Sequence, residues 1–199
     1  MKLDQLTAIS PLDGRYRAKL EQLAEFVSEL GLQRYRVHVE LCWFVHLANE
    51  PNIPELPPLS ANARSTISSL DKQFDAAGGE RIKVIERTTN HDVKAVEYFV
   101  KERLAQCPDL APHIEFVHFA CTSEDINNIA HALTLKDVRE HLVLPQMDRL
   151  IASIRGLAQS FADVAMLSRT HGQAASPTTM GKELAIVVAR LERQRNSFG

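Results

Sequence analysis

Cysteine is scarce in this chain, and its pattern excludes two classes of small protein. Only three cysteines occur in 199 residues, at Cys42, Cys107 and Cys121. They are odd in number, far apart and never spaced as C-x-x-C, so neither a disulfide framework nor a zinc site built from cysteines is expected. A reducing cytoplasm is the compartment that fits this pattern best.

Long apolar runs and an excess of positive charge are also missing. No segment approaches the roughly 20 apolar residues that a membrane-spanning helix requires, and Met1 leads into a polar segment without the apolar core of a signal peptide. The 23 basic and 25 acidic residues give a net charge of −2, which provides no sequence-wide positive field for a nucleic acid. We therefore expect a soluble cytoplasmic protein with no membrane and no nucleic-acid partner.

Several familiar catalytic motifs are absent as well. The chain has no H-E-x-x-H pair, no G-x-S-x-G elbow and no glycine-rich phosphate loop. The eight histidines show no recognisable ligand spacing, and we expect no metal and no other cofactor. Five of them are interpreted as surface or helix-face residues, namely His38, His46, His113, His131 and His141.

Helical periodicity dominates what is present and predicts an all-α fold. Apolar residues recur every three or four positions, with capping residues, glycines and prolines near the ends of the runs. The expected helices cover residues 17–30, 37–48, 60–78, 91–104, 123–138, 145–161 and 177–191. Residues 54–58 form a proline-rich linker, and 81–87 are ambiguous between a helical turn and an extended segment.

This order of helices predicts two domains. We expect a small helical domain over residues 1–120 and the first helices of a bundle over residues 121–199. Three long helices after residue 120 would leave apolar stripes that need further helices, from a longer chain or from partner subunits.

Four polar clusters stand beside these helices. They are Asp13-Gly14-Arg15-Tyr16, Thr89-Asn90-His91-Asp92, Thr122-Ser123-Glu124-Asp125 and a loop between two helices, Leu167-Ser168-Arg169-Thr170-His171-Gly172-Gln173. Each cluster alone has a structural explanation as a turn or a helix cap. Together they favour an anionic substrate that needs a proton, because helix N-termini attract anions and two histidines can move protons near neutral pH.

Longer segments around these clusters resemble the adenylosuccinate lyase family of the fumarase and aspartase superfamily. They are Asp13-Gly14-Arg15-Tyr16, Glu86-Arg87-Thr88-Thr89-Asn90-His91-Asp92-Val93, His118-Phe119-Ala120-Cys121-Thr122-Ser123-Glu124-Asp125-Ile126-Asn127-Asn128 and Ser168-Arg169-Thr170-His171-Gly172-Gln173. They occur in order over nearly the whole chain and separate this family from argininosuccinate lyase and fumarase. The resemblance implies a fumarase-type helix bundle that cleaves adenylosuccinate to AMP and fumarate. It also implies cleavage of succinyl-aminoimidazole-carboxamide ribotide (SAICAR) earlier in purine synthesis.

The same resemblance implies a role for each candidate residue. His171 is similar to the general acid that protonates the departing nitrogen, and His91 to the histidine that holds the substrate beside it. A purine amine expelled without protonation would leave as an unstable anion and would therefore be a poor leaving group. A positioned imidazole that protonates it contributes on the order of 10² to 10⁴ in rate. The other implied substrate contacts are Thr122, Ser123 and Thr170 for the succinyl carboxylates, Arg15 and Tyr16 for the phosphate, Asn90 and Asp92 beside the pocket, and His118 near Thr122.

Two features depart from the family's pattern. Ala174-Ala175 stands where the family usually has Pro-Ala, and the family's general base, a serine on a Ser-Ser-x-Met-Pro loop, has no match in these 199 residues. The resemblance therefore implies an N-terminal portion, inactive alone, of a homotetramer whose active sites each combine three subunits. Two other interpretations stay open: another fumarate-releasing lyase of the superfamily, and a non-catalytic nucleotide-binding or assembly module.

Overall fold

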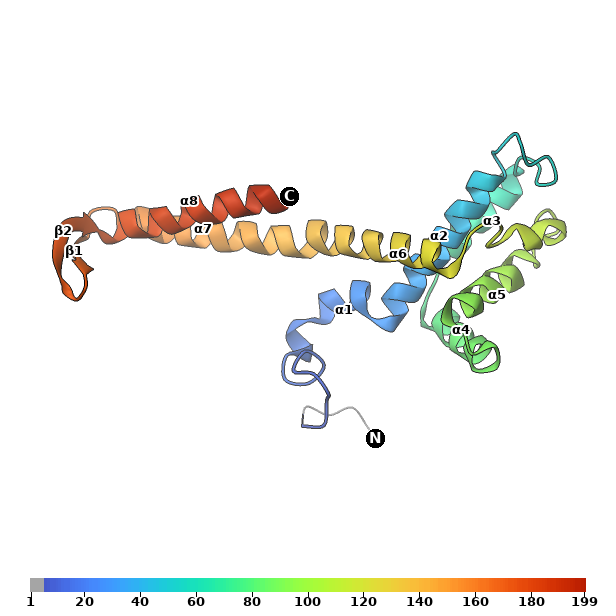
Figure 1. The fold of residues 1–199 in the computed structure, drawn as a ribbon, viewed down its shortest axis with the longest axis horizontal. Coiled ribbons are helices and arrows are strands. Elements are labelled where there is room, and N and C mark those ends of the chain that lie inside the picture. Colours follow the sequence, from blue (N-terminus) through green and yellow to red (C-terminus); the bar gives the residue numbers. More distant parts are fainter. Residues whose placement is uncertain (1–5) are drawn as a thin grey trace. The chain divides into compact units, whose positions relative to one another are not determined.

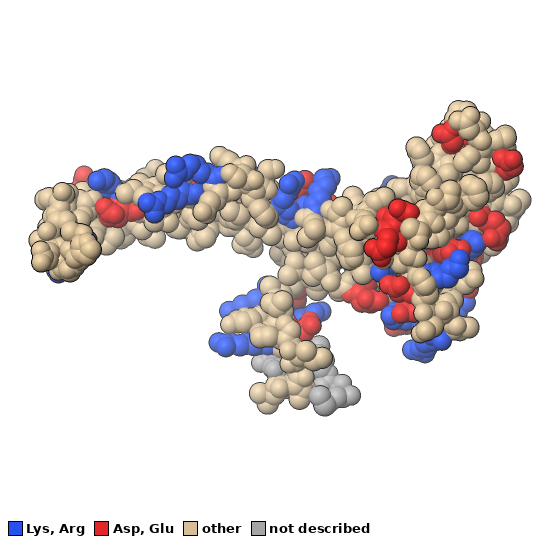
Figure 2. Space-filling model, viewed as in Figure 1, with Lys and Arg blue, Asp and Glu red and all other residues tan. Residues whose placement is uncertain are grey.

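A computed structural model describes residues 6–199 and is predominantly helical (Figure 1). The chain divides into two compact units, Met1–Lys136 and Asp137–Gly199. Apart from one small two-stranded sheet, the regular elements of the described residues are helices, so the all-α prediction is confirmed. No helix in the described range combines the length and apolar content that crossing a bilayer would take. On the face drawn in Figure 2, acidic and basic side chains occur on both units.

The first unit has its core around α2 (Glu29–Leu47) and α5 (Asp92–Leu104). Phe44, Val96 and Phe99 are almost completely buried there, and Phe74 meets Phe99 edge to face with 5.7 Å between ring centroids. The other helical segments are η1 (Arg17–Lys19), α1 (Glu21–Val27), α3 (Ala61–Lys72), α4 (Ala76–Thr89), η2 (Ala111–Phe116) and α6 (Ser123–Val138).

The helix predicted over residues 17–30 is present only in part: η1 and α1 cover residues 17–19 and 21–27, and the chain breaks at Ser28. The Ser28 hydroxyl accepts the N–H of Gly31 and caps α2, so Gly31 lies in the first turn of a helix rather than at the end of one. A Cβ on Gly31 would come within 2.4 Å of the Phe26 carbonyl oxygen. Glycine therefore lets the last turn of α1 approach the first turn of α2.

The start of α4 also differs from the prediction. Asp75 accepts the N–H of Gly78 at 3.0 Å and caps α4, so Gly78 and Gly79 lie in the first turn of this helix instead of fraying the preceding one. Gly78 packs against the rings of Phe74 and Phe99, which leaves no room for a larger side chain without movement. The ambiguous residues 81–87 are helical.

The first turns of α6 belong to the first unit. Ile126 and Ala130 are buried together with Val39 of α2 and Val93 of α5. The two compact units consequently divide after Lys136, so residue 120, our predicted domain boundary, falls inside the first unit.

The second unit consists of a π-helical turn, η3 (Arg139–Val143), followed by α7 (Leu144–Ser160), a hairpin and α8 (Met180–Phe198). The helices α7 and α8 lie side by side (Figure 1). Arg195 binds both carboxylate oxygens of Asp148, at 2.8 and 2.9 Å, and Arg155 pairs with Glu192. A Cβ on Gly181 would meet the Ala158 carbonyl oxygen at 2.4 Å, so the start of α8 touches the backbone of α7.

The segment predicted as a loop is a β-hairpin. Strand β1 (Ala165–Thr170) pairs antiparallel with β2 (Gln173–Thr179), with an irregularity between Leu167 and Arg169. Pro177 lies opposite Leu167, a position that a two-stranded sheet tolerates because both of its strands are edges. The predicted helix start at Ser176-Pro177 is therefore wrong; α8 begins at Met180, capped by the Thr179 hydroxyl.

Candidate active site

His91 stands where α4 ends and α5 begins. Asn90 closes α4 in a left-handed conformation, φ 50°, and the next residue caps α5 by accepting the Lys94 N–H at its Nδ1, 3.2 Å away. Because Nδ1 accepts a hydrogen bond, the proton of the neutral ring is on Nε2. That nitrogen lies 3.5 Å from the Ser123 hydroxyl. The structure thus brings the His91 and Ser123 clusters together, with a ring N–H available at an exposed position.

Asp92 is held by a residue that the sequence analysis missed. The Arg36 guanidinium, 6% exposed, donates to Asp92 at 2.7 Å and to the Asn127 side-chain oxygen at 2.9 Å. Burial alone would raise the pKa of Asp92, but the Val93 N–H and the Arg36 charge hold it below its usual value. Asp92 is therefore a bound carboxylate, and Arg36 joins α2, α5 and α6 beneath the two motifs.

Thr122 and Ser123 open α6. The Thr122 N–H donates to the Asp125 carboxylate at 2.8 Å, and the Asp125 N–H donates to the Thr122 carbonyl at 3.0 Å. The carboxylate part of the predicted capping box is thus present. The Thr122 side chain is exposed and Ser123 is half-buried, so both lie at the surface of a helix N-terminus that favours anions.

His118 is held by Glu40, a second charged residue of α2 that sequence reasoning missed. The two side chains meet at 2.6 Å between Nδ1 and Oε1, and the Glu40 side chain is fully buried. Among the described residues, the second carboxylate oxygen of Glu40 has no hydrogen-bond partner. Burial raises the pKa of Glu40, and the hydrogen bond with His118 opposes this only in part.

The backbone leading to Thr122 is strained in two places. His118 and Ala120 have positive φ angles of 63° and 58°, a conformation that costs an L-residue about 1–2 kcal/mol. The Trp43 indole N–H binds the Phe119 carbonyl at 2.7 Å between these two residues. Contacts from α2 therefore fix the path of the chain into Thr122.

Arg15 and Tyr16 lie in an exposed segment before α1. The Arg15 guanidinium stands over the Tyr16 ring, 5.2 Å from its centroid. Within residues 6–199, no hydrogen bond or ion pair connects either residue to the His91 cluster. These two predicted phosphate contacts are thus paired with each other and not joined to the other candidates.

His171 occupies the tip of the hairpin in the second unit. Thr170 pairs with Gln173, which leaves His171 and Gly172 as a two-residue turn with φ angles of 51° and 77°. Positive φ at both central residues is the signature of a type I′ turn. The imidazole is exposed, and Thr170 beside it is exposed as well. The two candidate histidines lie in different compact units.

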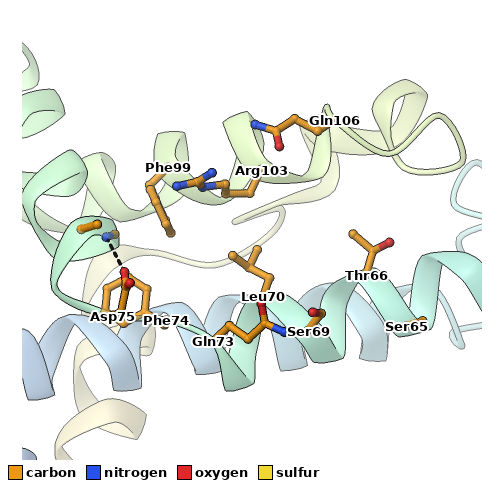
Figure 3. Close-up of a pocket in the computed structure, with 12 residues that line it drawn as sticks. Ser65, Thr66, Ser69, Leu70, Gln73, Phe74, Asp75, Phe99, Arg103 and Gln106 are labelled. Atoms are coloured by element: carbon orange, nitrogen blue, oxygen red, sulfur yellow. Dashed lines mark hydrogen bonds between the residues drawn. The ribbon is translucent and has the colours of Figure 1, made fainter.

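A polar hollow near the core of the first unit is not part of this site. A cavity of about 560 Å³ lies between α3 and α5, and its walls include Ser65, Thr66 and Ser69 on one side and Arg103 and Gln106 on the other (Figure 3). None of the predicted site residues lines it. The cavity and the His91 cluster are therefore separate features of the same unit.

A family model described as lyase matches residues 14–198. The chain belongs to this lyase family. Adenylosuccinate lyases from Vibrio cholerae and Haemophilus influenzae are 53% and 52% identical to the lyase chain over 194 residues, and that from Dictyostelium discoideum is 42% identical over 202 residues.

The lyase chain spans about two fifths of the length of these relatives. The matches cover 98% of the chain but 42% to 43% of each relative. Among solved structures, a 3-carboxy-cis,cis-muconate lactonizing enzyme from Pseudomonas putida matches with a TM-score of 0.68 and 20% identity, over 92% of the chain and 40% of that protein. A fumarate lyase from Mesorhizobium matches with a TM-score of 0.67 and 18% identity, over 91% and 39%. These likenesses confirm the predicted fumarase-type fold.

Proposed function

We propose that this chain supplies the general acid and part of the substrate site of an adenylosuccinate lyase, which eliminates fumarate from adenylosuccinate and from SAICAR. The observation that carries the proposal is the identity of about half of all residues to named adenylosuccinate lyases, in matches that cover 98% of the chain. The cytoplasmic location proposed with it rests on the scarce, unpaired cysteines.

In this proposal His171 protonates the nitrogen that leaves as the C–N bond breaks. Its position at an exposed hairpin tip supports the role, because an acid that serves a substrate from outside its own unit has to project from it. An imidazole has a pKa near neutrality, which allows both donation and recovery of the proton.

His91 is the substrate-holding partner in the proposal. With Nδ1 committed to the Lys94 N–H, its Nε2–H is directed outward beside Ser123 and can donate to a carboxylate or phosphate oxygen. Thr122, Ser123 and Thr170 are proposed to bind the succinyl carboxylates, while Arg15 and Tyr16 bind the nucleotide phosphate. Asn90, Asp92 and His118 are proposed as the surrounding wall, held by Arg36 and Glu40.

The general base and the remaining walls come from outside these residues in the proposal. No Ser-Ser-x-Met-Pro segment occurs in the chain, and the two candidate histidines belong to different compact units. In the proposal the base belongs to the part of the enzyme that these residues, which match 42% of each relative, do not include. A homotetramer in which several subunits complete each site would bring together histidines from different units. The exposed apolar side chains of α7 and α8, such as Leu150 and Leu157, support such an assembly.

A chimeric enzyme tests the proposal. The matched 194-residue region of the Vibrio cholerae adenylosuccinate lyase is replaced by this chain, and fumarate release from adenylosuccinate is followed by absorbance. We expect activity, lost by about 10² or more in kcat on changing His171 to Ala and reduced on changing His91 to Ala. His131→Gln, on α6 outside the clusters, is the matched control and should keep full activity.

Three results would contradict the proposal. A folded, tetrameric chimera without any lyase activity would mean that the chain takes no part in catalysis, and would favour a binding or assembly role. Preference for argininosuccinate over adenylosuccinate would assign the chain to a different fumarate-releasing lyase. Fumarate release that is insensitive to His171→Ala would reject His171 as the acid.

A further inference from the structure

A chain of hydrogen bonds runs beneath the candidate active site and joins the start of α5 to the start of α6. Arg36 of α2 lies at its centre, donating from Nη2 to the Asp92 carboxylate at 2.7 Å and from Nε to the Asn127 side-chain oxygen at 2.9 Å. Asp92 directly follows His91, and Asn127 lies one turn after Ser123 on α6. The chain therefore links the two segments that carry these candidate substrate donors.

Each group in this chain has only one hydrogen-bonding role open to it. The Asn127 amide group donates to the Glu124 carboxylate at 3.0 Å, so the Asn127 oxygen is the atom that faces the Arg36 guanidinium. A guanidinium only donates and a carboxylate only accepts, so none of these bonds can reverse its direction. The Arg36 side chain is 6% exposed, which leaves water little access to it. The link is thus a directional contact and not a mobile ion pair at the surface.

Apolar packing alone does not set the register between the two helix starts. Val93 of α5 and Ile126 of α6 are buried in one small cluster. Such packing is non-directional, so it holds the helices close without fixing how far one lies along the other. The contact between the His91 Nε2 and the Ser123 hydroxyl, at 3.5 Å, is too long to hold the two side chains by itself. The Arg36 link supplies the directional constraint.

We propose that Arg36 is a positioning residue that holds the His91 Nε2–H and the Ser123 hydroxyl where both donate to one carboxylate of the succinyl group. This inference rests on the proposed function and assigns the two donors to a single substrate group. Two donors 3.5 Å apart can each reach a different oxygen of one carboxylate. Arg36 acts from below through Asp92 and Asn127 and does not touch the substrate. Arg36→Lys would keep the charge, but an ammonium on a flexible stem cannot hold both partners in one fixed geometry.

The chimeric enzyme described above tests this role through its substrate and its two products. In Arg36→Lys and in Asn127→Ala, we expect KM for adenylosuccinate and the inhibition constant of fumarate to rise about 10-fold or more, because carboxylate binding is weakened. The kcat should stay within about threefold of the unmodified chimera, since the proposed acid His171 belongs to the other unit. The inhibition constant of AMP should not change, because AMP carries no succinyl carboxylate. Arg34→Lys, on the same helix and bonded to the Glu25 carbonyl, is the matched control and should keep every constant.

The double variant separates one shared link from two independent losses. Arg36→Lys with Asn127→Ala should raise KM no further than either change alone, because both break the same link. An additive rise, constants within about twofold of the unmodified chimera in both single variants, or an equal loss of AMP binding would overturn the proposal. If Arg36→Lys fails to assemble, Asn127→Ala decides alone, because it leaves the buried Arg36–Asp92 pair intact. An unmodified chimera without lyase activity would reject the proposed function and this inference with it, whereas an active chimera without these changes would reject the inference alone.

Discussion

Arg36 and Glu40 lie one turn apart on α2, and each holds a different segment of the candidate site. Arg36 binds Asp92 and Asn127, whereas Glu40 binds His118. Both side chains are ionisable and buried, and burying a charge costs folding free energy unless opposite charges and hydrogen bonds are well placed around it. Their burial is consistent with a helix that positions residues of two other segments rather than one that only fills the core.

Glu40 should make the stability of the chain depend on pH. The pKa of Glu40 in the folded state is raised above the usual value near 4.5. At pH values between the usual pKa and the folded pKa, the folded state therefore keeps a proton that the unfolded state has released. Stability contributed by this group is therefore complete below the usual pKa and falls as pH rises towards the folded pKa. Glu40→Gln cannot titrate. Urea unfolding at several pH values should show wild type losing free energy relative to Glu40→Gln as pH rises; a constant difference would contradict this.

These two residues also mark a limit of sequence reasoning. Arg36 and Glu40 occur in a helix that mixes charged and apolar residues on every side, so nothing in the pattern distinguishes them from solvated surface charges. Their partners are 56 and 78 positions away in the chain. His91, Thr122 and Ser123 could be selected beforehand because helix-capping chemistry depends on neighbouring residues alone. Buried pairing depends on tertiary contacts that a sequence pattern does not contain.

At the scale of elements, the contact between α7 and α8 depends on one small residue. A Cβ on Gly181 would meet the Ala158 carbonyl oxygen at 2.4 Å and the Ala162 Cα at 2.6 Å, whereas a Cβ on Gly156 would have nothing within 4 Å. Two glycines of the same helical pair therefore have opposite surroundings.

Gly181→Ala should lower the free energy of unfolding by about 1–3 kcal/mol, because the helices must separate to admit the methyl group. Gly156→Ala, in the interior of α7, should raise it by about 0.5–1 kcal/mol through helix propensity. Chemical denaturation of the two variants, monitored by circular dichroism, measures both. Equal effects of the two substitutions would mean that the close approach of α8 to α7 is not needed for stability.

Periodicity located most helices but misplaced their ends and missed the hairpin. The segment 165–179 carries polar residues at most positions and a proline inside β2, so it lacks the apolar alternation that identifies a strand. Its pairing comes from the His171-Gly172 turn, whose positive φ angles the sequence does not reveal for histidine. The break at Ser28 was missed because the apolar pattern continues across it.

At the scale of the molecule, the second unit leaves much apolar surface in contact with solvent. Leu150 and Leu157 of α7 are 54% and 48% exposed, and Ile186 and Val187 of α8 are 38% and 42% exposed. Soluble monomers rarely leave such side chains grouped on neighbouring helices. The pattern supports the proposed assembly of subunits through this helical pair.

Replacing Leu150 and Leu157 together by Glu should prevent that assembly. Two charges placed in an apolar interface cost several kcal/mol, enough to shift a micromolar association out of the measurable range. Sedimentation velocity of the wild type should show concentration-dependent association, and the double variant should sediment as a monomer. Val84→Glu, at an exposed position on α4, is the control and should associate as wild type does. A wild type that is monomeric throughout would contradict the prediction.

The left-handed backbone at His171 is unfavourable for the stability of the hairpin, although the proposed catalysis needs a histidine there. Glycine and asparagine are the residues that a type I′ turn accepts most readily, so the hairpin would fold more favourably with either of them in place of histidine. Selection or design guided by melting temperature alone would therefore favour replacing His171. If His171 is the general acid, as proposed, the variant selected for its high melting temperature would lack that acid and would lose activity.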